Sequence, residues 1–239
     1  MNWLAQHFAG LSLDEDHEGY FMGRGAKESA LVRLGVKSWQ PLPEDAPFED
    51  FRDRYGVRGE KLVGWTLWPM LAPSGRVLGF AGRKHGMKLI TRYLLPEGAW
   101  NPLWTGLTPE AMQRIWDGGD VCITEGIFDL LPMEWVLPEK AVVLASERAH
   151  LTDKHVEFLR RYVRREGQRV LMAYDNDATG RKGVEGGVDE TGKKRWGALQ
   201  RLERVKVKAL DVKYLGKDPG DVWMQGGLAG MRAAFNFDL

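Results

Sequence analysis

The chain has 239 residues, of which 34 are Lys or Arg and 33 are Asp or Glu, so its formal net charge is +1. Hydrophobic residues make up 44% and charged residues 28%, which is typical of a globular protein with one large or two modest domains. No apolar run is long enough to span a bilayer, and the polar N-terminus does not resemble a signal peptide, so we expect a cytoplasmic protein.

The first part of the chain, to about residue 117, is rich in Gly, Pro and Trp. Apolar runs at 61–68 and 76–81 predict two strands, and the Pro-Ser-Gly sequence between them predicts a hairpin. A third strand is predicted at 87–94, with Lys88 and Arg92 on one face because side chains alternate along a strand. The ten tryptophans are expected mainly in the core, although Trp65, Trp68, Trp100 and Trp104 are also candidates for stacking on bases.

The same region carries a concentration of positive charge. Between positions 76 and 92 the chain has no acidic residue but contains Arg76, Arg83, Lys84, His85, Lys88 and Arg92. A basic cluster of this kind is suited to a phosphate-bearing partner, although a solvated basic face explains such a run equally well when it is taken alone.

From residue 118 to about 215, strands and helices alternate. The pattern predicts strands at 120–124, 141–145, 168–174 and 205–210, and helices at 126–136, 153–165 and 195–204. Thr152 is the expected N-cap of the second helix. This alternation predicts a parallel sheet with helices on both faces, and therefore an α/β fold. The Gly-rich insert at 183–194 is expected to be a mobile loop or a small hairpin, and the simpler interpretation gives it no role.

Carboxylates follow two of the predicted strands directly. Glu125 comes after the strand at 120–124, and Asp175 and Asp177 come after the strand at 168–174. In open parallel sheets ligands bind outside the carboxyl ends of the strands, and Mg²⁺ takes carboxylate oxygens together with phosphate and water. The pattern therefore predicts a divalent-metal site, in which Glu125 is either a ligand or a general base.

Further acidic residues are candidates for the same site. Asp129 lies four residues after Glu125, which would place both on one helix face, and Asp218 and Asp221 follow the last predicted strand. Each motif also has an ordinary explanation, since Asp-x-Asp pairs and Asp-Pro-Gly-Asp are common in turns and Asp129 would suit a helix N-terminus. A zinc site is not expected, because Cys122 is the only cysteine, lies in an apolar strand and is expected to be buried.

The ordered set Glu-Gly-x-x-Asp, Asp-x-Asp with Gly-Arg-Lys, and Lys-Asp-Pro resembles the TOPRIM fold of DnaG-type primases, topoisomerases and certain nucleases. The upstream sequences Tyr20-Phe21-Met22-Gly23-Arg24-Gly25 and Gly75-Arg76-Val77-Leu78-Gly79-Phe80-Ala81-Gly82-Arg83 resemble the start of the primase RNA-polymerase core. The resemblance covers about residues 18–225 and favours a DnaG-type primase catalytic core. It departs from the family at Arg92, where lysine is usual, and in the longer insert after Lys182.

The resemblance implies the domain order and the roles of the residues. It implies an α+β N-terminal basic subdomain at 1–117, a TOPRIM domain with a helix-flanked parallel sheet at 118–215, and a C-terminal acidic motif and tail at 216–239. The implied catalytic residues are Glu125, Asp175 and Asp177, and the implied ligands of Mg²⁺ or Mn²⁺ are Glu125, Asp129, Asp175, Asp177 and Asp218. The residues implied in binding nucleic acid or nucleotide are Arg76, Arg83, Lys84, Lys88, Arg92, Tyr93, Arg181 and Lys182.

The implied activity is RNA primer synthesis on a single-stranded DNA template from ribonucleoside triphosphates. The partners implied are that template, the nucleotides, a replicative helicase and a separate zinc-binding module, since this chain lacks the cysteines of such a module. A phage or mobile-element origin is expected, with a nucleoid or host-cytoplasm location. Two alternatives stay open: a TOPRIM-type metal-dependent nuclease, and a nucleic-acid-binding module with a degenerate site.

Overall fold

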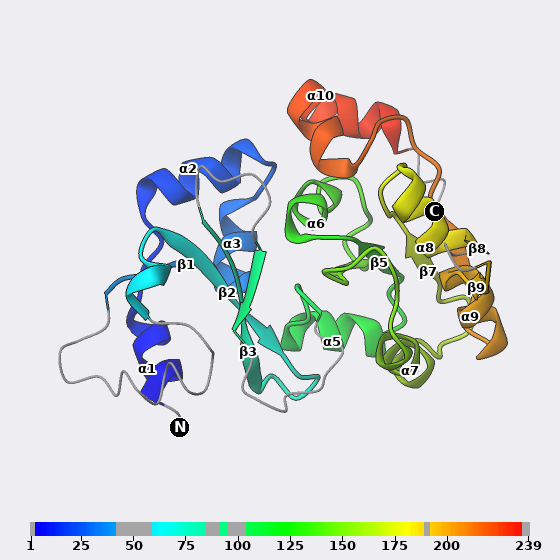
Figure 1. Ribbon diagram of the computed structural model, residues 1–239, viewed down its shortest axis with the longest axis horizontal. Helices are drawn as coiled ribbons and strands as arrows, with labels where there is room; N and C mark the ends of the chain where they lie inside the picture. Colours follow the sequence, from blue (N-terminus) through cyan, green and yellow to red (C-terminus); the bar gives the residue numbers. More distant parts are fainter. Residues whose placement is uncertain (1–2, 42–58, 85–90, 95–103, 189–191, 236–239) are drawn as a thin grey trace. The chain divides into compact units, whose positions relative to one another are not determined.

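The computed structural model describes residues 3–41, 59–84, 91–94, 104–188 and 192–235. The chain forms two compact units (Figure 1). Unit 1 comprises Met1–Gly23 and Lys27–Trp100, and unit 2 comprises Arg24–Ala26 and Asn101–Leu239. The functional boundaries predicted at 117 and 215 remain predictions.

Unit 1 is built on an antiparallel sheet in the order β1-β2-β3-β4. Its strands are β1 (Lys37–Ser38), β2 (Trp65–Leu71), β3 (Val77–Lys84) and β4 (Thr91–Leu94), and its helices are α1 (Trp3–Gly10), α2 (Glu15–Gly23), α3 (Glu28–Leu34) and the 3₁₀ helix η1 (Gly59–Leu62). The predicted hairpin is confirmed as β2–β3, with Trp68 opposite Ala81. Gly82 is required there, because a Cβ at this position would lie 2.0 Å from Leu67 Cδ2.

Unit 2 contains the predicted parallel sheet, in the order β10-β7-β5-β6. Its strands are β5 (Val121–Thr124), β6 (Val142–Ala145), β7 (Val170–Met172) and β10 (Ala209–Asp211). The chain leaves β5 towards β6 on one side and leaves β7 towards β10 on the other side. The strand order therefore reverses between β5 and β7, and a crevice is expected at the carboxyl ends of these two strands.

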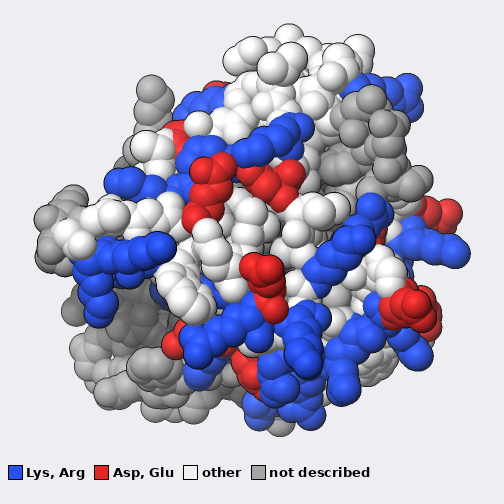
Figure 2. Space-filling model, turned by 90° about the vertical axis from the view of Figure 1, so that its right-hand side faces the viewer, with Lys and Arg blue, Asp and Glu red and all other residues white. Residues whose placement is uncertain are grey.

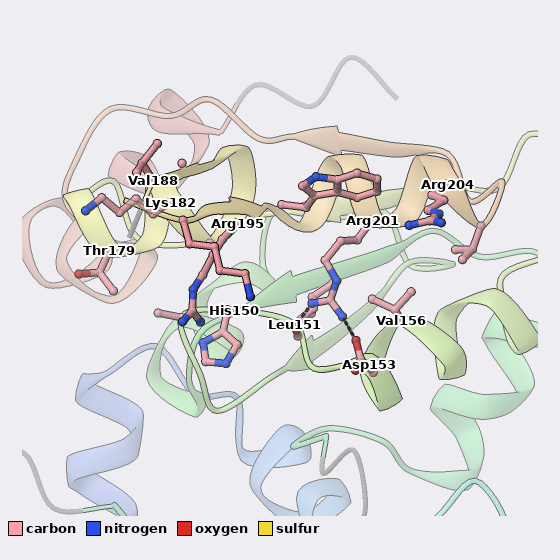
Figure 3. Close-up of a pocket in the computed structure, with 16 residues that line it drawn as sticks. His150, Leu151, Asp153, Val156, Thr179, Lys182, Val188, Arg195, Arg201 and Arg204 are labelled. Carbon is pink, nitrogen blue, oxygen red and sulfur yellow. Dashed lines mark hydrogen bonds and ion pairs between the residues drawn. The ribbon is translucent and has the colours of Figure 1, made fainter. Parts of the chain in front are cut away.

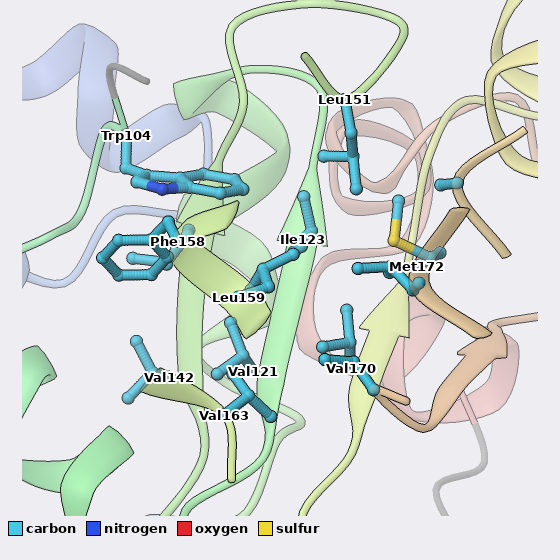
Figure 4. Close-up of a cluster of buried hydrophobic side chains, with 14 of the residues drawn as sticks. Trp104, Val121, Ile123, Val142, Leu151, Phe158, Leu159, Val163, Val170 and Met172 are labelled. Carbon is cyan, nitrogen blue, oxygen red and sulfur yellow. The ribbon is translucent and has the colours of Figure 1, made fainter. Parts of the chain in front are cut away.

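Helices cover the parallel sheet, as predicted. Alternate strand residues, among them Ile123, Leu144 and Met172, pack into one buried cluster with residues of α5 (Pro109–Trp116), α7 (Asp153–Tyr162) and α9 (Ala198–Arg204) (Figure 4). The buried side chains of α6 (Ile127–Met133) do not belong to that cluster, although α6 contacts β5 and β6, so α6 covers the other face. The last helix, α10 (Pro219–Ala234), packs against α6.

The start of α7 is fixed by hydrogen bonds between Thr152 and His155. Thr152 Oγ1 accepts a hydrogen bond from the backbone N–H of His155 at 3.2 Å, and the ring of His155 bonds the N–H of Thr152 at 3.1 Å. This reciprocal capping satisfies two backbone donors at the start of α7 and confirms Thr152 as the N-cap. The helix ends at Tyr162, a few residues before the predicted end.

Several expectations for the last third of the chain were wrong. A helix that the sequence pattern did not predict, α8 (Ala178–Glu185), follows Asp177 and includes the first residues of the insert. The rest of the insert forms the small hairpin that was one of its two predicted structures, with strands β8 (Gly186–Val188) and β9 (Lys194–Trp196). Helix α9 consequently starts at Ala198 instead of 195, and the final strand lies at 209–211 because Lys206 adopts a positive φ of 60° that interrupts an extended chain. The predicted C-terminal tail contains the helix α10, with a kink at Gly227.

A search of the described residues for a helix able to cross a bilayer finds none of sufficient length and apolar character.

Candidate metal and phosphate site

Glu125 and Asp175 lie side by side at the reversal point of the sheet. Glu125 follows the last residue of β5, and Asp175 follows β7, which pairs directly with β5. The backbone N–H of Asp175 donates a hydrogen bond to Glu125 Oε1 at 3.3 Å. The predicted convergence of the two carboxylates at adjacent strand ends is therefore present in the structure.

The surroundings raise the pKa values of both carboxyl groups. Burial, reinforced by the charge of Asp175, raises the pKa of Glu125 to about 7. Burial, reinforced by the charges of Asp218 and Asp177, raises the pKa of Asp175 to about 6. Since each shift reflects an unfavourable negative charge, this cluster of carboxylates gains from a nearby cation.

Asp177 is held by the helix that follows it. It is the N-cap of α8, and its Oδ1 accepts hydrogen bonds from the N–H groups of Thr179 at 2.8 Å and Gly180 at 2.9 Å. These bonds fix the first turn of α8 against the strand ends. A Cβ at Gly180 would lie 2.2 Å from the carbonyl oxygen of Asp175 and 2.7 Å from Glu125 Oε1, so glycine permits this close approach.

Asn176 connects the same strand end to the loop before α10. Its side-chain amide donates to the carbonyl oxygens of Tyr214 at 3.0 Å and Gly216 at 2.8 Å, and its backbone N–H donates to the carbonyl of Lys217 at 2.7 Å. The next residue in that loop is Asp218. Asn176 therefore positions the third acidic segment beside the first two.

Asp218 and Asp129 complete the acidic cluster. Asp218 is the N-cap of α10 and accepts from the N–H of Asp221 at 2.7 Å. Asp129, in the first turn of α6, accepts from the N–H of Gly220 at 3.2 Å. Burial, together with the charges of Asp175 and Asp218, raises the pKa of Asp129 well above its usual value. The expected shared helix face was wrong, because Glu125 precedes the helix, whose N-cap is Gly126.

These residues are compatible with a hard divalent cation. Asp175 Oδ1 is buried and has no hydrogen-bond partner among the described residues, and a Cβ at Gly180 would intrude on Glu125. No group of three or more His, Cys, Asp or Glu side chains in the described part of the chain is already arranged around a metal position. The donors that fit best are therefore the one or two carboxylates that Mg²⁺ takes from a protein, with phosphate and water completing the shell.

The Lys and Arg residues predicted to bind nucleic acid or nucleotide lie in different surroundings. Arg181 is engaged by Asp211 of β10, with contacts of 2.8 Å and 3.2 Å, and ties α8 to the sheet. Lys182, the next residue, is exposed and lines a pocket beside α8. Arg76 is exposed before β3, and Arg83 and Lys84 end that strand.

The remaining predicted contacts belong to the third strand of unit 1. Arg92 and Tyr93 lie on β4, where they pair with Gly82 and Ala81, and their side chains lie outside the described part of the structure. Lys88 lies outside the described residues altogether.

Sequence reasoning did not identify Asn176, Gly180 or Tyr214 as residues that build the site. The hydroxyl of Tyr214 donates to the carbonyl oxygen of Tyr174 at 2.9 Å, which fixes the loop to β7 from a second point. Gly180 had a visible signal, because it lies three residues after Asp177 and begins the Gly-Arg-Lys sequence. The roles of Asn176 and Tyr214 depend on contacts between segments about 40 residues apart, which the pattern of a single sequence does not show.

The candidate stacking tryptophans turn out to be core residues. Trp65, Trp68 and Trp104 are at most 5% exposed, and Trp100 lies outside the described residues. Cys122 is also fully buried, as predicted, and burial raises the pKa of its thiol.

The sheet and its acidic cluster match known proteins. Residues 122–221, which include every acidic residue discussed above, match the model of the Toprim-like family. A comparison with curated protein sequences gives no match.

Solved structures of primases share the fold. The chain is similar to the Aquifex aeolicus primase (zinc-binding and RNA polymerase domains), with a TM-score of 0.66 and 22% identity over 92% of this chain and 55% of that one. The RNA polymerase domain of Mycobacterium tuberculosis primase DnaG gives a TM-score of 0.67 with 17% identity, over 97% of this chain and 80% of that one. A DnaG primase catalytic domain bound to single-stranded DNA gives 0.61 with 18% identity, over 96% and 77%. Residues 122–221 thus match the Toprim-like family, and the chain shares the fold of DnaG-type primase catalytic cores. It spans about half the length of the Aquifex chain.

Proposed function

We propose that this protein synthesises RNA primers on single-stranded DNA by metal-dependent nucleotidyl transfer. The observation that carries the proposal is the pairing of Glu125 and Asp175 at the reversal point of the parallel sheet, with their pKa values raised and the Asp175 N–H bonded to Glu125. Phosphoryl chemistry needs negative charge to be neutralised and an attacking oxygen to be activated. A divalent cation held by this cluster would neutralise the charge, and a carboxylate of the cluster could take the proton of the attacking hydroxyl.

The residues divide the work according to their surroundings. Asp175, whose buried Oδ1 lacks a partner among the described residues, is suited to bind Mg²⁺ or Mn²⁺ directly, and Asp177 or Asp218, each at a helix N-terminus, would supply a second carboxylate. When bound, such an ion polarises a phosphoryl oxygen and lowers the pKa of an attacking hydroxyl. Glu125, which lies beside Asp175 at the strand end, is suited to accept the proton of the attacking 3′-hydroxyl.

Asp129 acts through the backbone instead of touching the substrate in this proposal. Its bond to the N–H of Gly220 holds the start of α10, and with it Asp218, next to β7. We class it as a supporting residue of the metal site.

The test is primer synthesis on single-stranded DNA with the four ribonucleoside triphosphates and Mg²⁺ or Mn²⁺. We expect short labelled RNA products from the wild-type protein, alone or with added helicase and zinc-module proteins, and none from Asp175→Asn. Full activity of Asp175→Asn would refute the site, and absence of product under every condition would refute the function. Degradation of labelled DNA in the absence of nucleotides would instead identify a nuclease.

The wider setting belongs to the same proposal. The template, the nucleoside triphosphates, a replicative helicase and a zinc-binding module are the proposed partners. A phage or mobile-element source and a cytoplasmic, nucleoid-associated location are proposed with them.

A further inference from the structure

A large pocket lies beside α8, and its described lining contains none of the acidic residues of the candidate metal site. Its volume is about 770 Å³, and it is lined by α8, both strands of the β8–β9 hairpin, α9 and the segment 149–153 (Figure 3). Among the described residues, the lining has five cationic side chains and one carboxylate: Lys182, Lys193, Arg195, Arg201 and Arg204, with Asp153. Figure 2, which views the molecule from this side, shows Lys and Arg prevailing over Asp and Glu on that face.

Asp153, the carboxylate of the described lining, is held by one of these cations. Arg201 donates to Asp153 Oδ1 at 2.6 Å and also bonds the carbonyl oxygen of Leu151, so this one arginine accounts for Asp153. Figure 3 places Lys182 at one end of the pocket, Arg204 at the other, and Arg195 between them. The positive charge is therefore spread along the pocket, as an extended anion requires.

The histidine in the pocket reports the same positive field. His150 lies near Arg195 and Arg201 in the pocket wall. Partial burial lowers its pKa, and the charges of Arg148, Arg201 and Arg195 lower it further. A site that disfavours a further proton in this way favours a bound anion.

An exposed aromatic ring completes the pocket. Trp196, the last residue of β9, is 51% exposed, and the guanidinium of Arg204 lies 5.1 Å from the centre of its ring. The described tryptophans of the predicted stacking platform are buried in cores, whereas Trp196 stands in the lining beside cations. An exposed aromatic next to cations is the arrangement by which proteins stack bases while holding phosphates.

A second hollow on the same hairpin provides an internal comparison. It has a volume of about 600 Å³ and shares Arg195, Trp196 and Arg204 with the first, but it adds the carboxylates Glu185 and Glu203. Its charges are mixed, so the attraction for an anion is concentrated on the side of Lys182 and His150.

We propose that this pocket, formed by the insert hairpin with α8 and α9, binds a segment of single-stranded nucleic acid, with phosphates on its cations and a base on Trp196. Its volume lies in the range of about 300–1,000 Å³ that holds organic ligands larger than a lone phosphate, and its cations extend from α8 to α9. Binding here uses neither the acidic cluster nor a metal, so the proposal goes beyond primer synthesis and is tested without it.

The test is equilibrium binding of a fluorescent oligothymidylate of about 10 nucleotides, measured by anisotropy in EDTA without nucleotides. We expect Trp196→Ala to weaken binding about 5- to 150-fold, the range found for loss of one base stack. Trp116→Ala is the matched control, because Trp116 is 46% exposed but lies on α5, outside this pocket. The control should bind within about twofold of wild type.

Salt dependence tests the phosphate contacts. Arg195→Ala and Arg204→Ala should each reduce the slope of log K against log salt by about 0.7, whereas Lys140→Ala, before β6 at the opposite edge of the sheet, should not. Bromouracil cross-linking should label a peptide that contains Trp196.

Three results would overturn the proposal. They are unchanged affinity of Trp196→Ala, an equal loss in Trp116→Ala, or cross-links confined to other parts of the chain. If thymidine monophosphate competes at the same concentration as the oligonucleotide, the ligand of the pocket is a mononucleotide and not a strand, which also contradicts the proposal. Because no step of the assay involves nucleotidyl transfer, a failure here leaves primer synthesis unaffected, and the reverse also holds.

Discussion

At the scale of single residues, the carboxylates that suit the acidic cluster to metal binding also lower the stability of the folded protein when no metal is bound. Glu125 and Asp175 are partly buried next to each other, and both pKa values are raised because ionisation brings negative charges together away from water. The metal-free protein is therefore less stable when these groups are ionised. This cost has a definite pH dependence.

We predict that the metal-free protein loses stability as the pH rises from about 4 to about 7. A carboxyl group whose pKa is raised in the folded state, to about 7 for Glu125 and about 6 for Asp175, binds more protons folded than unfolded in this interval. Its contribution is complete below the unfolded pKa and is lost as the pH passes through the folded pKa. Urea unfolding in EDTA across this range measures it.

Glu125→Gln should remove part of that dependence. At pH 8 we expect the variant to be more stable than wild type by about 1–2 kcal/mol, after allowance for partial exposure and shared titration. At pH 4 the two should be nearly equal, because Glu125 is then mostly protonated in both states. Equal stability of the two proteins at pH 8 would contradict the raised pKa.

Two substitutions of Asp177 distinguish its role as a carboxylate from its role as the N-cap of α8. Asp177→Ser keeps an oxygen for the N–H groups of Thr179 and Gly180, whereas Asp177→Ala removes it. We predict that only Asp177→Ala loses about 1 kcal/mol of stability, measured by urea unfolding. Both variants should lose primer synthesis by at least about 100-fold if the carboxylate holds the metal. Normal primer synthesis by Asp177→Ser would show that Asp177 serves only as the N-cap of α8 and does not hold the metal.

At the scale of elements, the site depends on how closely α8 and the 214–218 loop approach the end of β7. Gly180 allows the approach of α8, and Asn176 holds the loop through two carbonyl oxygens. Neither residue carries a charge, yet together they decide where Asp177 and Asp218 stand. Their substitution should therefore affect metal binding without removing a ligand.

Gly180→Ala should disturb the packing of α8 on the strand ends. A Cβ 2.2 Å from the carbonyl of Asp175 must displace the helix, and we expect a loss of about 1–3 kcal/mol together with weaker Mn²⁺ binding. Gly226→Ala is the control, since a Cβ there meets no atom within 4 Å. Thermal unfolding and Mn²⁺ titration of both variants measure the difference. A Gly180→Ala protein equal to the control would refute the close approach.

Asn176→Ala tests the loop. The variant leaves the carbonyl oxygens of Tyr214 and Gly216 without their donor, which should cost about 1–3 kcal/mol and weaken Mn²⁺ binding by letting Asp218 move. Gln113→Ala removes an exposed side-chain bond to Asp117 and should change stability by less than about 0.5 kcal/mol. Urea unfolding compares the two. If they behave alike, Asn176 does not hold the loop.

At the scale of the whole molecule, the sequence predicted the parallel sheet, the hairpin of unit 1 and the meeting of Glu125 with Asp175. These follow from local patterns, since apolar runs give strands and the carboxyl ends of parallel strands share one edge. The α8 helix was missed because Gly180 and Gly183 lower helix propensity, and here Asp177 caps the helix and tertiary contacts stabilise it. For the insert, the sequence predicted either a mobile loop or a small hairpin, and the hairpin is present. The basic pocket beside it depends on how α8 and α9 are placed, which no sequence pattern predicted.

Unit 2 contains the whole acidic cluster, and it includes a short segment from early in the chain. Within this unit the carbonyl oxygen of Gly25 accepts a bond from the Trp135 indole at 2.8 Å, and the Arg24 guanidinium lies 5.6 Å from the centre of the Phe128 ring. Arg24 was one of the residues that carried the resemblance to primases. Its contacts give it a structural role beside α6, the helix that carries Asp129.

The central claim is that the acidic cluster at the reversal of the sheet binds a divalent metal, with Asp175 as a direct ligand. Calorimetric titration of Mn²⁺ into the wild-type protein, Asp175→Asn and Glu157→Gln tests it most directly. Glu157 is an exposed carboxylate of α7 paired with Arg160, so its loss removes the same charge elsewhere. We predict that Asp175→Asn weakens Mn²⁺ binding at least about tenfold while Glu157→Gln binds as wild type does. Equal Mn²⁺ affinity in all three proteins would contradict the account.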